Sequence, residues 1–195
     1  MRELEVMPLM SATDPAWVDI ALSDFDAFLL DHAACERKAS AVAMSFVAKY
    51  PDKSQLIEPM ICLAREELAH FHEVYLLIAK RGLQLPPDTP DPYLKGLLQH
   101  VRHGRDEHFL DRLLVSAIVE ARGCERFKLV SEALPDSELK DFYRGLARAE
   151  AGHFMIFIRI ARHYFEQSMI DARLAEFLKK EAEVIAQLPH RPAVH

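Results

Sequence analysis

Residues 66–72 read EELAHFH, and within this stretch residues 67–70 (ELAH) place a carboxylate three positions before an imidazole. The same spacing recurs at residues 150–153, which read EAGH. In an α-helix, residues three apart lie on one face and are separated by about 4.5 Å along the axis. Each Glu-x-x-His motif can therefore direct both of its polar side chains toward one metal ion.

A further Glu stands at nearly the same distance before each motif. Glu36 precedes Glu67 by 31 residues, and Glu120 precedes Glu150 by 30 residues. Such a gap is the natural length of a helix, a turn and an antiparallel return. Four helices of this kind supply the ligand set of a carboxylate-bridged di-metal four-helix bundle. The predicted metal ligands are Glu36, Glu67, His70, Glu120, Glu150 and His153, and we assign no catalytic residue beyond them.

The identity of the metal follows from the donors. Six mixed carboxylate and imidazole ligands around two ions favour iron, with manganese as the alternative, over tetrahedral zinc. By analogy with the bundle pattern, Glu67 and Glu150 would bridge the metals while Glu36 and Glu120 would be terminal ligands. Glu125 competes with Glu120 for its place, but it would shorten the second gap to 25 residues.

Helical patterns fill nearly the whole chain, so the expected fold class is all-α, a ferritin-like four-helix bundle with one long crossover and short additional helices. The proline-rich stretch 85–92 is the expected crossover, and Gly82 is expected at the end of the second long helix. Asp24 is the expected N-cap of the first long helix. The first long helix is expected to run from its cap at Asp24 to a tight connection at residues 49–52. The other expected helices span about 15–22, 53–81, 93–101, 106–133, 137–165 and 169–188.

The expected domain organisation is a single ferritin-like di-metal domain over residues 1–195. Its long crossover spans about 82–105, and a C-terminal accessory helix spans about 168–188. Half of the residues are hydrophobic, which is enough for a sizeable core.

Composition and charge restrict the remaining possibilities. No apolar run reaches 18 residues and the N-terminus lacks the apolar region of a signal peptide, so we expect a cytoplasmic protein without a membrane partner. The three cysteines lack a C-x-x-C pair, which argues against zinc knuckles and iron–sulfur clusters. Four charges of the formal net −6 belong to the predicted ligands, so a metal-loaded surface would be close to neutral.

Several segments together resemble the bacterial tRNA 2-methylthio-N6-isopentenyladenosine hydroxylase family. They are Glu36, residues 66–72 (EELAHFH), residues 120–126 (EARGCER) and residues 150–154 (EAGHF). The similarity covers nearly the whole chain, including the proline-rich crossover. The segment 120–126 and the overall length point to this family in particular, because the di-metal motif is shared by many ferritin-like proteins.

The resemblance implies an O2-dependent di-iron monooxygenase that hydroxylates the isopentenyl group of a hypermodified adenosine next to the tRNA anticodon. It implies two iron ions per chain, O2 as co-substrate, and the tRNA anticodon loop rather than DNA as the nucleic-acid partner. The chain has no flavin or nicotinamide fingerprint, so the electrons would come from an external reductase or ferredoxin.

A basic group is the candidate RNA-facing surface, because phosphates are contacted by Arg and Lys side chains. Its members are Arg102, Arg105, Arg112, Arg122 and Arg126. An ordinary solvated helix charge is the competing interpretation for these residues.

Two other classes of function remain open at this point. A ferritin-like iron-storage or peroxide-reducing protein would use the same ligands without an organic substrate. A metal-free helical interaction protein would bind neither iron nor manganese. A multi-subunit assembly would indicate a cage-forming storage protein. The absence of bound iron and manganese would indicate the metal-free interaction protein.

Overall fold

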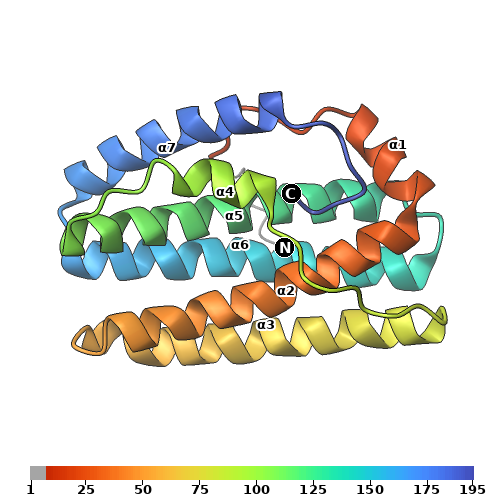
Figure 1. Cartoon of the computed structure of the whole chain (residues 1–195), viewed down its shortest axis with the longest axis horizontal. Helices are drawn as coiled ribbons and strands as arrows, with labels where there is room; N and C mark the ends of the chain where they lie inside the picture. Colours follow the sequence, from red (N-terminus) through yellow and green to blue (C-terminus); the bar gives the residue numbers. More distant parts are fainter. Residues whose placement is uncertain (1–7) are drawn as a thin grey trace. The chain divides into compact units, whose positions relative to one another are not determined.

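The computed structural model describes residues 8–195, which form seven α-helices and no strand. Their order along the chain can be followed in Figure 1. The helices are α1 (Ala16–Ser23), α2 (Phe25–Lys49), α3 (Ser54–Lys80), α4 (Pro92–Leu98), α5 (Arg105–Ala133), α6 (Ser137–Tyr164) and α7 (Gln167–Gln187). Each expected helix is present, with ends that differ by no more than about three residues. Among the described residues, no helix is long and apolar enough to cross a membrane.

The chain divides into two compact units, and each is built on one pair of long helices. The first unit, which we call the α5–α6 unit, contains residues 8–18, 90–190 and 195. The second, the α2–α3 unit, contains residues 19–89 and 191–194. Within each unit the two long helices run side by side in opposite directions (Figure 1). The expectation of a single domain stays a prediction.

The ends of α2 and α3 follow local sequence signals. The side chain of Asp24 accepts a hydrogen bond from the backbone N–H of Ala27 at 3.1 Å, which caps α2 as expected. Gly82 follows α3 with φ of 72°, the left-handed conformation that a helix end commonly adopts. Between these ends, the Ser40 hydroxyl donates to the backbone carbonyl of Ala64 at 2.7 Å, which fixes α2 against α3.

The crossover leads from Gly82 to α4 without helical structure. Two bonds hold it on α2, because Arg37 pairs with Asp88 and Lys38 donates to the backbone carbonyl of Thr89 at 2.8 Å. Pro92 begins α4, where its missing N–H costs no hydrogen bond, and the Asp91 side chain caps the helix. The helix ends at Leu98, three residues earlier than expected.

The α5–α6 unit is centred on α5, most of which is buried. Helix α6 is its antiparallel partner, and α4 and α7 also contact it. Residues 134–136 connect α5 to α6, and the Asp136 side chain caps α6 by accepting from the N–H of Leu139 at 2.9 Å. The C-terminal helix α7 therefore packs on the α5–α6 pair.

Candidate metal centre

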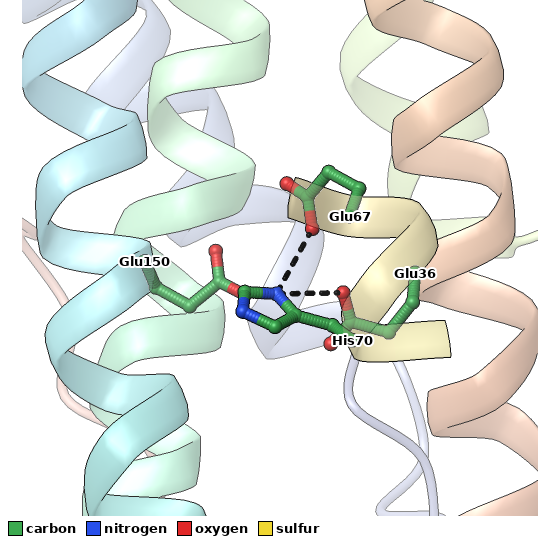
Figure 2. A group of neighbouring side chains, drawn as sticks. All are labelled: Glu36, Glu67, His70 and Glu150. Carbon is green, nitrogen blue, oxygen red and sulfur yellow. Dashed lines mark ion pairs between the residues drawn. The ribbon is translucent and has the colours of Figure 1, made fainter. Parts of the chain in front are cut away.

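Each unit carries one group of two carboxylates and one imidazole. In the α2–α3 unit, Glu36 on α2 meets Glu67 and His70 on α3. Nδ1 of His70 lies 3.7 Å from Oε2 of Glu36 and 3.5 Å from Oε2 of Glu67. Figure 2 shows these two approaches to the His70 ring as dashed lines. Glu36 and Glu67 are buried, and the His70 side chain is 13% exposed.

The electrostatics of this group favour a cation among the carboxylates. Burial alone lowers the pKa of His70, but the hydrogen-bonding and charge interactions with Glu36 and Glu67 outweigh it and raise the pKa to about 10. The protonated ring thus places a positive charge where two buried carboxylates need one. A metal ion would supply that charge instead and would release the proton from the ligating nitrogen.

The α5–α6 unit repeats the arrangement with Glu120 on α5 and with Glu150 and His153 on α6. Nδ1 of His153 lies 3.5 Å from Oε2 of Glu150, the same distance that separates the motif partners in the other unit. All three side chains are buried. Gly123, one turn after Glu120, lies close to Glu150, since two side-chain carbons of Glu150 are 3.8 Å from the place of a Cβ atom, an ordinary contact distance.

The donor geometry of each group fits a divalent metal. Within each group, the three ligand atoms lie within 4.8 Å of one another. Ligands bound at about 2.0–2.2 Å to one ion are separated by roughly 3–3.5 Å, so only small movements would be required. Oε2 of Glu150 is buried and has no hydrogen-bond partner among the described residues. A buried carboxylate oxygen in that situation is costly unless a cation accompanies it.

The pattern of metal motifs did not single out His32, which the structure places next to a predicted ligand. Nε2 of His32 lies 2.7 Å from Oε1 of Glu36, and the His32 side chain is fully buried. The signal was present in the sequence, because residues four apart on a helix are neighbours. It was missed because His32 lacks the Glu-x-x-His spacing.

Two of the five arginines expected on an RNA-facing surface are buried, and for them the prediction was wrong. Arg122 donates to Glu181 on α7 and to Thr13, and it also pairs with Glu125. The Arg126 guanidinium lies over the Trp17 ring, 4.5 Å from its centroid. Both side chains bind groups far away in sequence, which a helical pattern cannot reveal.

The other three arginines lie nearer to solvent. Arg102 is partly exposed, but its guanidinium donates two hydrogen bonds to the buried Asp111 at 2.7 and 3.0 Å. Arg105 is exposed and Arg112 is half-buried. A contact of these residues with RNA stays a prediction.

Glu125 has a structural environment different from that of the ligands. Its carboxylate accepts from the Thr13 hydroxyl at 2.6 Å and from the Thr13 backbone N–H at 3.0 Å. The Glu125 carboxylate, the alternative to Glu120 as a ligand, is thus bonded to Thr13.

The chain is similar to known hydroxylases along most of its length. Residues 3–195 match the family described as tRNA-(MS[2]IO[6]A)-hydroxylase (MiaE). A tRNA 2-(methylsulfanyl)-N(6)-isopentenyladenosine(37) hydroxylase from Pseudomonas putida KT2440 is 39% identical over 177 residues, which cover 91% of this chain and 85% of the relative. The hydroxylase of the same name from Salmonella typhimurium LT2 is 29% identical over 222 residues, covering 89% and 82%.

A solved structure is similar in fold as well. It is described as Protein 43 with aldehyde deformylating oxygenase activity from Synechococcus. Its TM-score is 0.90 at 34% identity, and the match covers 94% of this chain and 92% of that one. The expected all-α, ferritin-like fold class is confirmed, and buried carboxylate and imidazole groups indicate a metal site in it. The chain belongs to the MiaE family of tRNA hydroxylases, as the resemblance in its motifs predicted.

Proposed function

We propose that the two groups of ligands act together as one di-iron centre, and that the protein uses it with O2 to hydroxylate the isopentenyl group of a hypermodified adenosine beside the tRNA anticodon. The observation that carries the proposal is the repeated group of two carboxylates and one imidazole, with 3.5 Å between the Nδ1 and Oε2 atoms of both Glu-x-x-His motifs. The family match over residues 3–195 supplies the substrate class.

Each ligand has a role in this proposal. His70 and His153 would each bind one metal through Nδ1, the ring nitrogen that faces the carboxylates. Glu36, Glu67, Glu120 and Glu150 would hold the ions together with these two imidazoles. Both units would then belong to a single di-metal domain. Manganese fits the same donors, but O2 chemistry favours iron.

The bound metals would supply the redox chemistry that amino-acid side chains lack. The overall reaction consumes one O2, two electrons and two protons, inserts one oxygen atom into a C–H bond and releases one water. The chain itself carries no flavin or nicotinamide fingerprint, so an external reductase or ferredoxin must deliver the electrons. We expect the reaction in the cytoplasm, where such a donor and tRNA are both present.

The protein's own contribution is to hold the ligands in a largely buried, apolar setting. Each carboxylate ligand lies on a long helix among buried apolar residues, such as Leu63 and Ala64 before Glu67 and Ala147 before Glu150. Water exclusion strengthens every charge interaction at the centre and protects a reactive oxidant from side reactions. No base or nucleophile beyond the ligands is required, because the substrate C–H bond has no acidic proton to remove.

A tRNA anticodon loop is a suitable substrate because its unstacked bases can enter a protein pocket. The net charge of −6 implies that phosphate contacts are local rather than spread over the surface. Arg105, which is exposed, and Arg112, which is half-buried, are the remaining candidates for such contacts. Substituting them should weaken binding to tRNA and reduce its salt dependence.

The decisive experiment is a reconstitution under anaerobic conditions. Protein loaded with Fe²⁺ should bind two metal ions per chain by elemental analysis. After addition of a reductant and O2, nucleoside mass spectrometry should find one added oxygen atom on isopentenylated tRNA. Failure of the loaded and reduced protein to modify this tRNA would contradict the proposal.

The iron-storage or peroxide-reducing alternative uses the same ligands but predicts other results. Such a protein would accumulate iron in a large assembly or consume peroxide without an organic substrate. The relatives named above are hydroxylases, which favours the tRNA reaction. A tRNA-independent turnover of O2 or peroxide, with no modified nucleoside, would support the alternative.

A further inference from the structure

We infer that His32 is a positioning residue that restricts Glu36 to one metal-binding oxygen, and that it does so for only one of the two metal positions. This inference rests on the proposed di-metal centre. It concerns a residue outside the six ligands, on the helix turn before Glu36.

The two oxygens of Glu36 have different partners. Oε1 lies 2.7 Å from Nε2 of His32, whereas Oε2 faces Nδ1 of His70 at 3.7 Å. An ionised carboxylate only accepts hydrogen bonds, so Nε2 of His32 must carry the hydrogen. With Oε1 engaged in this way, Oε2 is the oxygen directed toward a metal that His70 also binds.

The His32 ring is itself held in place. Its side chain is fully buried, and it contacts the ring of Phe28, one turn earlier on α2, with the ring centroids 6.2 Å apart. A buried hydrogen bond to an ionised acceptor is stronger than one between neutral groups, so it can hold Glu36 against rotation. Partners of this kind orient metal ligands and tune their affinity.

The internal repeat does not extend to this residue. Four residues before Glu120, at the place that matches His32, the chain has the buried Ser116. A serine hydroxyl has a much shorter reach than an imidazole, so it cannot supply the same support. The two metal positions are therefore chemically unequal, although their six ligands repeat.

Cobalt binding tests the inference without relying on enzyme activity. Metal-free protein is titrated with Co²⁺ while the visible absorption is recorded, because the spectrum depends on coordination geometry. Two variants are compared with wild type: His32→Leu, which removes the donor, and His32→Gln, which keeps an N–H donor. His163→Leu and His163→Gln, at an exposed position on α6, are the matched controls.

The expected result is a loss confined to one of the two cobalt ions. His32→Leu should bind that ion about 10–100-fold more weakly and change its spectrum, as is typical when an outer partner of a ligand is removed. His32→Gln should retain most of the affinity, and both His163 variants should match wild type.

Each other outcome has a definite meaning. If the Leu and Gln variants behave alike, the hydrogen bond has no positioning role and the inference is wrong. The same conclusion follows if both cobalt ions are weakened equally. If His32→Leu does not fold, as judged by circular dichroism, the comparison of His32→Gln with wild type decides. Wild-type protein that binds no cobalt would instead contradict the proposed centre.

Discussion

The two helical pairs present the same set of three ligands, two Glu and one His, but support them differently. In the α5–α6 unit, α4, α6 and α7 contact α5, and ion pairs of buried carboxylates link α5 to α7. In the α2–α3 unit, two ion pairs outside the ligand group, Arg37–Asp88 and Arg81–Asp26, lie at exposed positions. Surface pairs contribute little to stability. We therefore expect the order of the α2–α3 pair to depend more on a bound metal than that of the α5–α6 pair.

A buried network of charges and hydrogen bonds links three helices of the α5–α6 unit. Arg122 and Glu181 are both fully buried, and Nη2 of Arg122 lies 2.7 Å from Oε1 of Glu181. The Tyr93 hydroxyl donates to the same oxygen at 3.0 Å, so α4, α5 and α7 meet at one carboxylate. A second link joins Asp111 on α5 to Arg173 on α7 at 2.7 Å. Because these links join α5 to α4 and α7 without using a metal ligand, we expect them to persist when no metal is bound.

The largest effect should follow from removing an imidazole ligand. His70→Ala and His153→Ala should both abolish tRNA hydroxylation, because each leaves one metal position with carboxylates only. Elemental analysis measures the loss of bound metal, and nucleoside mass spectrometry measures the loss of hydroxylation. If either variant hydroxylates tRNA at the wild-type rate, the substituted histidine is not a required metal ligand.

Breaking the buried ion pair between Arg122 and Glu181 should produce the next largest effect, a loss of stability. Arg122→Met leaves the charge of Glu181 buried, and we expect a loss of about 3–5 kcal/mol in the free energy of unfolding. The double variant Arg122→Met/Glu181→Leu should recover most of it, since no buried charge remains. Urea denaturation measures both. Equal stability of the single and double variants would show that the charge itself is unimportant.

Removal of the metal should affect the two pairs unequally. A metal present at about 100 times its dissociation constant stabilises the folded protein by about 2.7 kcal/mol. We expect chelation to increase amide hydrogen exchange mainly in α2 and α3, and much less in α5. Mass spectrometry of peptides reads out each helix. A uniform increase in hydrogen exchange would contradict the expectation that the α2–α3 pair depends more on bound metal than the α5–α6 pair.

The stability of the α5–α6 unit should fall in acid as Asp111 takes up a proton. Burial raises the pKa of Asp111, but hydrogen bonds from Arg173 and Arg102 outweigh it and hold the pKa at about 2. Because the folded pKa lies below the unfolded value of about 3.9, the stabilisation is full above pH 4. It should be lost as the pH falls from about 4 to about 2, by roughly 2 kcal/mol.

Denaturation at several pH values measures this dependence, with Asp111→Asn as the comparison. The variant should lack the part of the acid slope that Asp111 contributes. An unchanged slope would mean that other carboxylates account for it.

The smallest effect belongs to the end of α3. Gly82 has φ of 72°, and no atom lies within 4 Å of the place of a Cβ, so a side chain would meet backbone strain but no clash. Gly82→Ala should reduce the free energy of unfolding by about 1 kcal/mol, and Gly82→Asn by less. Thermal unfolding gives both values. Equal stability of the three proteins would show that this end of the α2–α3 pair is already frayed.

Local chemistry made much of this protein predictable. Helix ends at Asp24 and Gly82 depend on neighbouring residues only, and so do the two Glu-x-x-His motifs, because a helix fixes the relation between residues three apart. The contact of His32 with Glu36 is equally local and could have been predicted from a spacing of four. The sequence by itself therefore determined the helices and the ligand spacing within them.

Only the tertiary structure decided which charged residues on those helices are buried. Arg122 looks like a surface residue in a helical pattern, but its partners are Thr13, far towards the N-terminus, and Glu181, on the last helix. A guanidinium can be buried only where such distant acceptors converge, and that convergence depends on how α5 packs with its neighbours. The pairing of Glu36 with His70 is tertiary for the same reason, since the two residues lie on different helices.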